Sequence, residues 1–353
     1  MEAELKIIDK IELAEKEKYT WKICTKMFYN ENIYSISGLN KNDRNDFIII
    51  KIYKLNKINK EKVLEKIITE FYFTFSLKPY EYFPKQISGL LSNDNEYLFL
   101  ISKENTTELC YLIKSIEYNY LNNQTLLKWI IYQIAFGLYI LHSNNIIHHN
   151  IKSSNILINS EGGIRIRDFS CSIFKGEKSY AYTLAYASPE FLIDISNIDE
   201  KFDIWGLGVI MLELFCKKQP ILGDSNIKNR RDQLDFIFPQ FGINHKYSDE
   251  ELKKELNENK NIKFEINKNY LEKIKDDKAK YLLKNLLVFD PKKRFSAKEV
   301  LDSEYLAEYK GIDPFDIKPI EYPIDYKEFS NKKIDKNKFI EILKKIISNM
   351  SKF

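Results

Sequence analysis

The most informative segment of this chain is Ile147-His148-His149-Asn150-Ile151-Lys152-Ser153-Ser154-Asn155. Two short β-branched segments follow it, residues 156–159 and 164–167, and they read as a pair of strands. Thirteen residues after Asn155 comes Asp168-Phe169-Ser170. Taken singly, Asn155 would most often form a turn and Asp168 would cap a strand end, so their interpretation depends on the rest of the chain.

Three further motifs lie downstream. They read Tyr186-Ala187-Ser188-Pro189-Glu190, Asp203-Ile204-Trp205-Gly206-Leu207-Gly208 and Asp290-Pro291-Lys292-Lys293-Arg294. With the two stretches above, they resemble the H-R-D-x-x-x-x-N, D-F-G, Y-x-A-P-E, D-x-W-S-x-G and D-P-x-x-R motifs of protein kinases. Five motifs in the family's order and at its distances make the resemblance specific, and it covers about residues 19–306. It implies an α+β, two-lobed protein kinase fold with a β-rich small lobe and a helical large lobe.

The residue pattern along the chain predicts the same division, with strands first and helices later. Predicted strands are 19–24, 33–36, 47–53 and 97–101, and predicted helices are 59–77, 127–141, 202–215, 278–288, 297–301 and 335–348. Asp335 is expected to cap the last helix. We expect a small lobe over residues 1–103, a large lobe over 104–306 with a solvated insert at about 226–267, and a C-terminal extension over 307–353 that packs on the kinase domain.

The nucleotide-binding residues follow from the resemblance. A lone lysine usually lies on a solvated edge, but Lys51 lies within the apolar run 47–52, where a buried ammonium needs a partner. Glu70, nineteen residues later on the apolar face of a predicted helix, is the expected partner, as in the family's Lys–Glu pair. The resemblance also makes Asn155 and Asp168 magnesium ligands, so the cofactors would be ATP and Mg²⁺ if nucleotide binding is retained.

Three other residues are expected to have structural roles. Glu190 and Arg294 match the family's buried ion pair, and breaking such a pair costs roughly 3–5 kcal/mol. Asp203 matches the residue that holds the backbone of the catalytic loop. These three positions favour a protein kinase over small-molecule kinases, which generally lack this set.

Position 150 is the decisive departure, because the family has Asp where this chain has Asn150. A carboxylate accepts a proton from the attacking hydroxyl, whereas an amide does not near neutral pH. Losing a general base typically costs about 10²–10⁴-fold in rate. Lys152 and Thr183, which match the family's residues beside the base, could still position a substrate and leave slow transfer.

Other parts of the machinery also depart from the family. The segment aligned with the glycine-rich phosphate loop, residues 26–31, has no glycine, and Ser170 replaces the glycine of D-F-G. His149 replaces the arginine that grips a phosphorylated activation loop. In that loop Lys178-Ser179-Tyr180 stands where mitogen-activated kinases have T-x-Y, so the phosphoacceptor threonine is missing too. We interpret these as a correlated loss of activation by phosphorylation.

Bulk composition excludes several other classes of protein. The 55 basic and 51 acidic residues nearly cancel without a basic block, which argues neither for nor against nucleic acid. We expect no nucleic-acid partner. Four cysteines scattered singly make a disulfide framework or a zinc site improbable and fit a reducing compartment, cytoplasmic and/or nuclear. The charged N-terminus lacks the apolar core of a signal peptide, and the longest apolar run, 129–141, is too short for a bilayer.

Two segments indicate the branch of the family. Gln219-Pro220-Ile221-Leu222-Gly223-Asp224 and the following Asp232-Gln233-Leu234 resemble the mitogen-activated and cyclin-dependent kinases. In the mitogen-activated kinases an acidic pair after the domain docks basic linear motifs, which makes Asp313 and Asp316 candidates here. A plain turn at a domain end explains these two residues equally well.

Three functions remain open from the sequence. The first is a pseudokinase of Ser/Thr type that acts by binding protein partners in kinase signalling, as a monomer. The second is an active Ser/Thr kinase, which is supported by the retained residues Lys51, Glu70, Lys152, Asn155, Asp168 and Thr183. The third is a nucleotide sensor that binds ATP without transfer.

Overall fold

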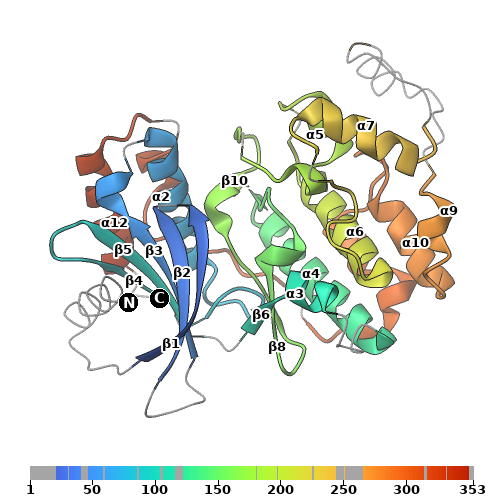
Figure 1. The fold of residues 1–353 in the computed structure, drawn as a ribbon, viewed down its shortest axis with the longest axis horizontal. Helices are drawn as coiled ribbons and strands as arrows, with labels where there is room; N and C mark the ends of the chain where they lie inside the picture. Colours follow the sequence, from blue (N-terminus) through green and yellow to red (C-terminus); the bar gives the residue numbers. More distant parts are fainter. Residues whose placement is uncertain are drawn as a thin grey trace. The chain divides into compact units, whose positions relative to one another are not determined.

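The computed structural model forms two compact units, each described here by itself (Figure 1). Unit 1 comprises residues 1–106, 167–170 and 320–353, and unit 2 comprises residues 107–166 and 171–319. The described residues are 21–30, 32–40, 47–58, 60–85, 87–103, 106–115, 122–179, 181–196, 198–224, 226–243, 250, 265–313, 316–330 and 332–349.

Unit 1 is built on an antiparallel sheet of five strands in the order β1-β2-β3-β5-β4. The strands are β1 (Trp21–Asn30), β2 (Ile33–Asn40), β3 (Phe47–Lys54), β4 (Ile87–Leu91) and β5 (Tyr97–Lys103). Successive side chains of a strand point to opposite faces. Ile50 and Ile52 of β3 therefore join one buried cluster with residues of β2 and β5, whereas Lys51 and Tyr53 face the other side, toward α2 (Glu61–Ser76).

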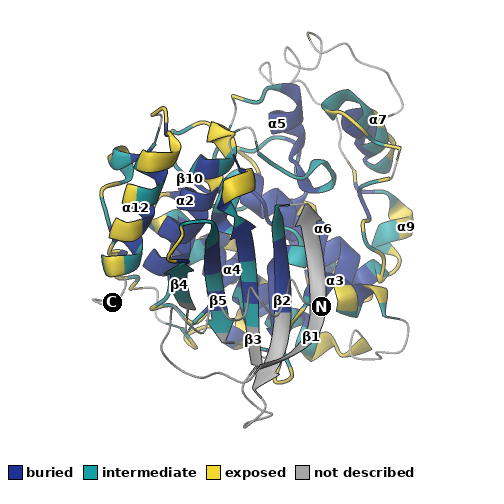
Figure 2. Cartoon of the chain, turned by 60° about the vertical axis from the view of Figure 1, so that its left-hand side comes forward, coloured by how far each residue is buried: buried dark blue, intermediate teal, exposed yellow. Residues whose placement is uncertain are grey.

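The C-terminal part of the chain completes unit 1. The helix α12 (Lys336–Asn349) packs on α2 and β4, and in Figure 2 it carries buried and exposed residues. Tyr72 of α2 stacks on Tyr322, with ring centroids 5.3 Å apart, and meets the ring of Phe329 edge-on at 5.3 Å. The side chain of Asp335 accepts a hydrogen bond from the backbone N–H of Lys338 at 2.8 Å, which is the capping contact expected for this helix.

Unit 2 is mainly helical. Its helices are α3 (Leu109–Lys114), α4 (Gln124–Ser143), α5 (Pro189–Ile193), α6 (Lys201–Cys216), α7 (Arg230–Gln240), α9 (Lys268–Leu271), α10 (Asp277–Leu286) and α11 (Ala297–Leu301). Short strands are β7 (Ile146–Ile147), β8 (Ile156–Asn159), β9 (Ile164–Ile166) and β10 (Ile173–Phe174), and β6 (Thr106–Glu108) spans the boundary between the units.

The core of unit 2 lies around α4 and α6. Fourteen of the sixteen residues of α6 are buried, so this helix is covered on all sides. Among the described residues, α4 alone is long and apolar enough to cross a membrane, but 67% of its most apolar stretch is buried, as in the core helix of a globular unit.

The structure follows the sequence expectations where the periodic pattern is strong. Both β8 and α11 span the predicted residues, and the other predicted elements differ by a few residues at their ends. The strand β4 was not expected, because it contains Gly89. A side chain at Gly89 would place its Cβ 2.9 Å from the ring of Phe71, so close packing requires glycine in this strand.

Some expectations concern residues that are placed differently or not described. Residues 230–240, within the expected solvated insert, form α7 and bury Leu234, Ile237 and Phe238. Residues 167–170 belong to unit 1 although they fall within the range expected for the large lobe. Residues 26–30 of the glycine-free loop lie in β1, but their side chains, residue 31, Tyr180 and most of 244–264 are outside the described part of the chain.

Candidate functional site

The part of the candidate site in unit 1 centres on a lysine held by a buried carboxylate. The Nζ atom of Lys51 donates hydrogen bonds to both carboxylate oxygens of Glu70, at 2.6 and 2.8 Å. The same Nζ lies 3.7 Å from Oδ1 of Asp168. The hydroxyl of Tyr53 donates to Oε2 of Glu70 at 2.5 Å. The structure therefore brings together the expected pair and Asp168, with a tyrosine that the sequence analysis did not single out.

Burial determines the electrostatics of this group. Glu70 is 4% exposed, and desolvation raises its pKa above the ordinary value, against the opposing effects of Lys51 and of the two hydrogen-bond donors. The pKa of Tyr53 is also raised, first by burial and then by the charge of Glu70, so its hydroxyl keeps its proton. A proton-carrying phenol and an ammonium thus both donate to one carboxylate.

Asp168 has an unusual backbone conformation. Its φ is +68°, in the left-handed region that non-glycine residues seldom adopt. The hydroxyl of Ser170 donates to Oδ1 of Asp168 at 2.7 Å, and Phe169 packs edge-on against Phe83 with ring centroids 5.8 Å apart. The serine that replaces the family's glycine is therefore engaged with the candidate metal ligand.

The part of the site in unit 2 is the catalytic loop. Lys152 Nζ donates to Thr183 Oγ1 at 3.2 Å, and Thr183 Oγ1 donates to Asn150 Oδ1 at 2.8 Å. The amide Nδ2 of Asn155 donates to the backbone carbonyl of Asn150 at 2.9 Å. The expected residues 150, 152, 155 and 183 thus lie in one network.

This network fixes the orientation of the Asn150 amide. An ammonium has no acceptor, so Thr183 Oγ1 must accept from Lys152 and has its single proton left to donate. In the structure this proton goes to Oδ1 of Asn150, at 2.8 Å. The remaining polar group of the side chain is then the NH₂, which can donate hydrogen bonds but cannot receive a proton usefully at neutral pH.

Asp203 holds the backbone of the catalytic loop. Its two carboxylate oxygens accept hydrogen bonds from the backbone N–H groups of His148 and His149, both at 2.8 Å, and one oxygen lies 3.0 Å from Nε2 of His142. Burial alone would raise the pKa of Asp203, but the hydrogen bonds and charge of the nearby histidines bring it below the ordinary value. The loop is therefore anchored on an ionised carboxylate.

His149 lies in an aromatic environment. Its ring is buried, with centroids 4.3 Å from Phe202 and 5.1 Å from Phe191, and its Nδ1 donates to the backbone carbonyl of Ala181 at 3.0 Å. Burial lowers the pKa of His149 to about 4, although the charge of Asp203 opposes this shift. The position where the family has a phosphate-binding arginine therefore holds a neutral imidazole.

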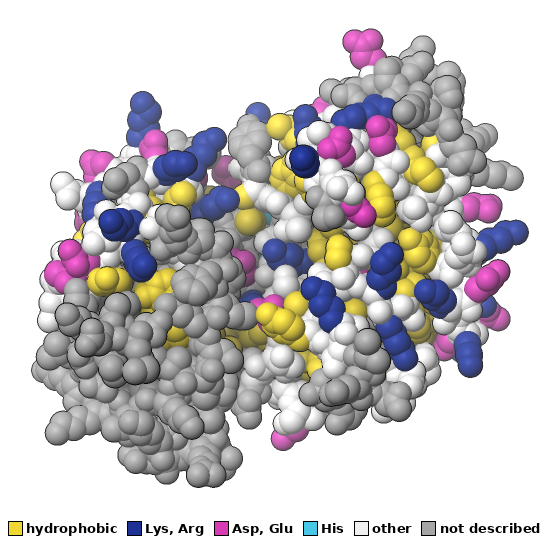
Figure 3. All heavy atoms as spheres, in the orientation of Figure 1, with side chains coloured by type: hydrophobic (Ala, Val, Ile, Leu, Met, Phe, Trp, Pro, Cys, Tyr) yellow, Lys and Arg dark blue, Asp and Glu magenta, His cyan; other side chains and the backbone are white. Residues whose placement is uncertain are grey.

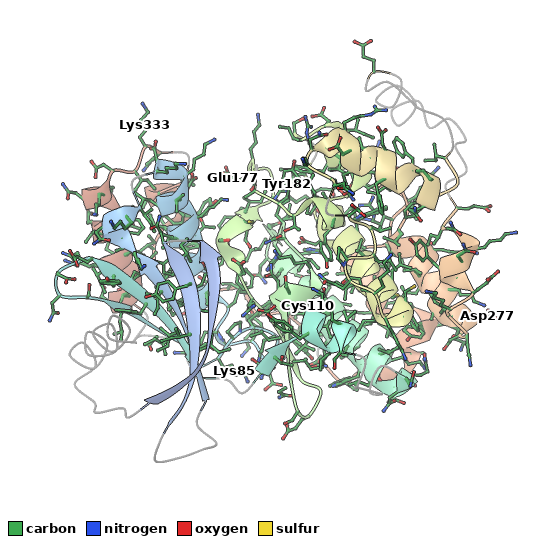
Figure 4. All side chains as sticks on the ribbon, in the orientation of Figure 1. Lys85, Cys110, Glu177, Tyr182, Asp277 and Lys333 are labelled. Atoms are coloured by element: carbon green, nitrogen blue, oxygen red, sulfur yellow. The ribbon has the colours of Figure 1, made fainter. Side chains whose placement is uncertain are left out.

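Tyr182 extends this aromatic contact along the activation segment (residues 168–190). Its ring packs edge-on against Phe191 at 4.8 Å, and the side chain is labelled in Figure 4. Together with the bond from His149 to Ala181 and that from Lys152 to Thr183, three successive residues of the segment are held by unit 2.

Arg294 and Glu190 form a fully buried pair. Two guanidinium nitrogens of Arg294 donate to the two carboxylate oxygens of Glu190, each at 2.8 Å. The remaining donors reach the backbone carbonyls of Val288 and Lys201, and the guanidinium lies 5.2 Å from the ring centroid of Trp205. Such complete pairing is what a buried charge requires.

One buried carboxylate, Glu213, was missed by the sequence analysis. Glu213 accepts a hydrogen bond from the Tyr186 hydroxyl at 2.7 Å, and this hydroxyl also contacts Ser153 at 3.1 Å and Gln219 at 3.2 Å. Burial raises the pKa of Glu213 to about 7. The sequence indicated Glu213 only as a single acidic residue inside the apolar run of α6. It indicated Tyr53 only by its two-residue spacing from Lys51 on a strand.

The candidate docking residues differ in exposure. Asp313 accepts a hydrogen bond from the Tyr132 hydroxyl at 2.8 Å, whereas Asp316 is exposed. Residues 314 and 315 between them are not described. Figure 3 shows basic and acidic side chains interspersed over the coloured part of the face drawn there, without a large field of one sign.

The residues present suit a nucleotide with a divalent cation. The side chains of Lys51 and Asp168 are 17% and 24% exposed, so an ammonium and a carboxylate are both accessible beside a buried counter-charge. Asn155 and Asp168, the two expected magnesium ligands, lie in different units. Within the described ranges, no cluster of three or more His, Cys, Asp or Glu side chains could hold a metal by itself.

The chain belongs to the protein kinase domain family, whose model matches residues 35–306. It is 29% identical over 241 residues to the CTD kinase subunit alpha of Saccharomyces cerevisiae, covering 65% of this chain and 44% of that protein. It is 31% identical over 208 residues to the mitogen-activated protein kinase hog-1 of Neurospora crassa, covering 57% of this chain and 56% of that protein.

A third relative is the cyclin-dependent kinase G-1 of Oryza sativa subsp. indica, 29% identical over 236 residues, or 62% of this chain and 32% of that protein. The matches thus span about half or less of the length of these relatives. They confirm the resemblance to the mitogen-activated and cyclin-dependent branch and the two-lobed α+β kinase fold.

Proposed function

We propose that this chain is a kinase-like domain of Ser/Thr type whose phosphotransfer is lost or strongly impaired, and which acts by binding protein partners in kinase signalling. The observation that carries the proposal is the orientation of the Asn150 amide. Its oxygen accepts the Thr183 proton, so its remaining polar group is a donor. A substrate hydroxyl placed there would meet N–H groups instead of a proton acceptor.

The other side chains that transfer would need are present in the sequence. Bound ATP with magnesium would supply the phosphoryl group, Lys51 would neutralise phosphate charge, and Asn155 and Asp168 would hold the metal. Lys152 and Thr183 would orient the substrate hydroxyl. Without a base at position 150, the hydroxyl keeps its proton, and we expect turnover to fall by about 10²–10⁴-fold relative to an aspartate.

The environment of His149 supports the loss of phosphate-dependent activation. A neutral imidazole between two phenylalanine rings has no charge with which to bind a phosphate. Its Nδ1–H instead holds the carbonyl of Ala181, so the segment is ordered by an uncharged contact. We infer that the activation segment of this chain adopts its conformation without phosphorylation.

The partners are inferred from the family and from two acidic residues. Kinase relatives of this branch bind protein substrates and partners, and a basic linear motif would suit the exposed carboxylate of Asp316 and the neighbouring Asp313. We propose a monomer of the cytoplasm and/or nucleus without a nucleic-acid or membrane partner.

An active Ser/Thr kinase is the alternative, and the intact pair of Lys51 and Glu70 favours it. The same pair also favours a nucleotide sensor, since it prepares a phosphate site whether or not transfer follows. Turnover separates the active kinase from the main proposal, whereas ATP binding without transfer would identify the sensor.

The deciding experiment compares four forms of the purified chain with radiolabelled ATP, magnesium and a generic protein substrate. They are wild type, Asn150→Asp, Lys51→Met as the inactive reference, and Asn269→Asp as a control that adds the same charge at an exposed position. We expect labelling only in Asn150→Asp, at least about 10²-fold above wild type. Brisk labelling by wild type that Lys51→Met abolishes would establish the active kinase instead.

Nucleotide binding is measured separately from transfer. A rise in the melting temperature with ATP and magnesium, lost in Lys51→Met, would show that the nucleotide site is competent. Binding without transfer in wild type would identify the nucleotide sensor.

A further inference from the structure

Tyr53 is a buried tyrosine that contacts both members of the lysine–glutamate pair. Its hydroxyl donates to Oε2 of Glu70 at 2.5 Å, and its ring centroid lies 5.5 Å from Nζ of Lys51. The side chain is 1% exposed and packs on Phe71, the residue after Glu70, with ring centroids 6.1 Å apart. No other hydroxyl donates to the Glu70 carboxylate among the hydrogen bonds of the described residues.

The spacing of Tyr53 and Lys51 on β3 explains why both residues contact Glu70 of α2. The two residues are separated by one position on β3, so both project toward α2. Lys51 reaches both oxygens of Glu70, and Tyr53 reaches Oε2. A carboxylate with a single donor can rotate about its last bonds, whereas one held by donors from two residues of a rigid strand has a defined orientation.

We propose that Tyr53 is a positioning residue: its hydroxyl fixes the Glu70 carboxylate so that the Lys51 ammonium stays directed beside Asp168. This inference rests on the phosphate-binding role proposed for Lys51, but not on whether phosphate is transferred.

The charge balance of the group explains why the hydroxyl matters. Glu70 is buried, and desolvation disfavours its ionised form. Each hydrogen bond that the carboxylate accepts therefore helps to keep Glu70 ionised. Removing the hydroxyl leaves Oε2 with Lys51 as its remaining donor within this group of three residues. The carboxylate then binds a proton more readily or turns, and in either case Lys51 is held less firmly.

The reactivity of Lys51 tests this inference directly. Full-length wild type and Tyr53→Phe are acetylated with trace acetic anhydride, and the rate at each lysine is measured by mass spectrometry. An ammonium held by two carboxylate oxygens reacts slowly, so we expect labelling of Lys51 to rise about tenfold or more in Tyr53→Phe, the equilibrium worth of one charged hydrogen bond. Lys54, on the same strand, is the internal reference and should not change.

Two further variants separate positioning from packing. Tyr97→Phe removes a hydroxyl from the same sheet at a residue that packs against the cluster of Ile50 and Ile52, and it should leave the Lys51 rate unchanged. In a Glu70→Gln background, Tyr53→Phe should have no additional effect, because the carboxylate through which it acts is gone.

The inference is overturned if Lys51 labelling in Tyr53→Phe stays within twofold of wild type or falls. A rise that persists in the Glu70→Gln background, or that Lys54 shares, would also overturn it, because the hydroxyl would then act on general stability. Neither nucleotide binding nor transfer enters this measurement, so its failure is distinct from failure of the proposed function.

Discussion

His149 and Glu213 should make opposite contributions to the pH dependence of stability in unit 2. Burial lowers the pKa of His149 from its ordinary 6.5 to about 4, so below pH 6.5 the unfolded chain binds a proton that the folded chain does not. This contribution to stability is therefore present above pH 6.5 and is lost as the pH falls toward 4. Burial raises the pKa of Glu213 from 4.5 to about 7, so its contribution is present below pH 4.5 and is lost as the pH rises toward 7.

The two contributions have similar magnitudes. Each tenfold change in proton affinity is worth 1.36 kcal/mol, so each group changes the free energy of unfolding by about 3 kcal/mol across its window. The windows overlap almost completely. In the wild type the two effects should largely cancel, and the pair should leave stability nearly flat between about pH 4.5 and 6.5.

Two substitutions should each remove one of the opposing contributions, so that the pH dependence of stability due to the other can be measured. His149→Asn keeps a residue that tolerates the left-handed backbone at φ +61° but does not titrate, and Glu213→Gln keeps an acceptor for Tyr186 without a carboxylate. With histidine removed, stability should fall by about 3 kcal/mol from pH 4.5 to 7. With glutamate removed, it should fall by the same amount from pH 6.5 to 4.

The assay is urea unfolding at several pH values, followed by tryptophan fluorescence. In a Trp21→Phe background both remaining tryptophans, Trp129 and Trp205, lie in unit 2 and report on its unfolding. At each pH, the variant's free energy of unfolding is subtracted from that of the parent. This cancels the contributions of the titrating groups that both proteins contain. A difference curve that is flat between pH 4.5 and 6.5, or that slopes the other way, would refute the assignment for that residue.

Three structural predictions follow from buried contacts and are measured as free energies of unfolding. Glu190→Ala leaves the Arg294 charge buried without its carboxylate and should cost about 3–5 kcal/mol; a loss below about 1 kcal/mol would contradict the pairing. Gly206→Ala would place a Cβ 2.8 Å from the carbonyl oxygen of Ile151 and should cost about 1–3 kcal/mol, with a neutral result showing that the catalytic loop can move away freely. Phe329→Ala removes a fully buried ring from the surface of α2 and should destabilise unit 1 by about 3–5 kcal/mol, and an unchanged unfolding curve would show that the C-terminal segment is not part of the unit 1 core.

The relation between Lys51 and Glu70 illustrates what local patterns can predict. The lysine lies in an apolar strand and the glutamate on the apolar face of a helix, and neither is stable there alone. Each of these charges needs a partner of opposite sign, and the family's spacing joins the two positions, so the pair could be predicted across nineteen residues. The structure places Nζ of Lys51 2.6 Å from Oε1 of Glu70. The residues of the catalytic loop could be predicted from the sequence equally well, because they lie within a few positions of one another.

Tyr53 shows what such patterns leave out. A tyrosine in a strand satisfies β propensity and burial whether or not its hydroxyl has a charged partner. Its bond to Glu70 depends on how far α2 lies from the sheet, and that distance is set by packing along the whole helix.

The family, most of the long strands and helices, and the replacement of a base by Asn150 could be predicted from the sequence, because hydrophobic period, turn residues and motif spacing are local properties of the chain. The orientation of the Asn150 amide, the neutral imidazole of His149 and the raised pKa of Glu213 became known only from the folded chain. Those properties depend on desolvation and on donors from distant segments, such as Thr183, Phe202 and Tyr186, which meet the site only when the chain has folded.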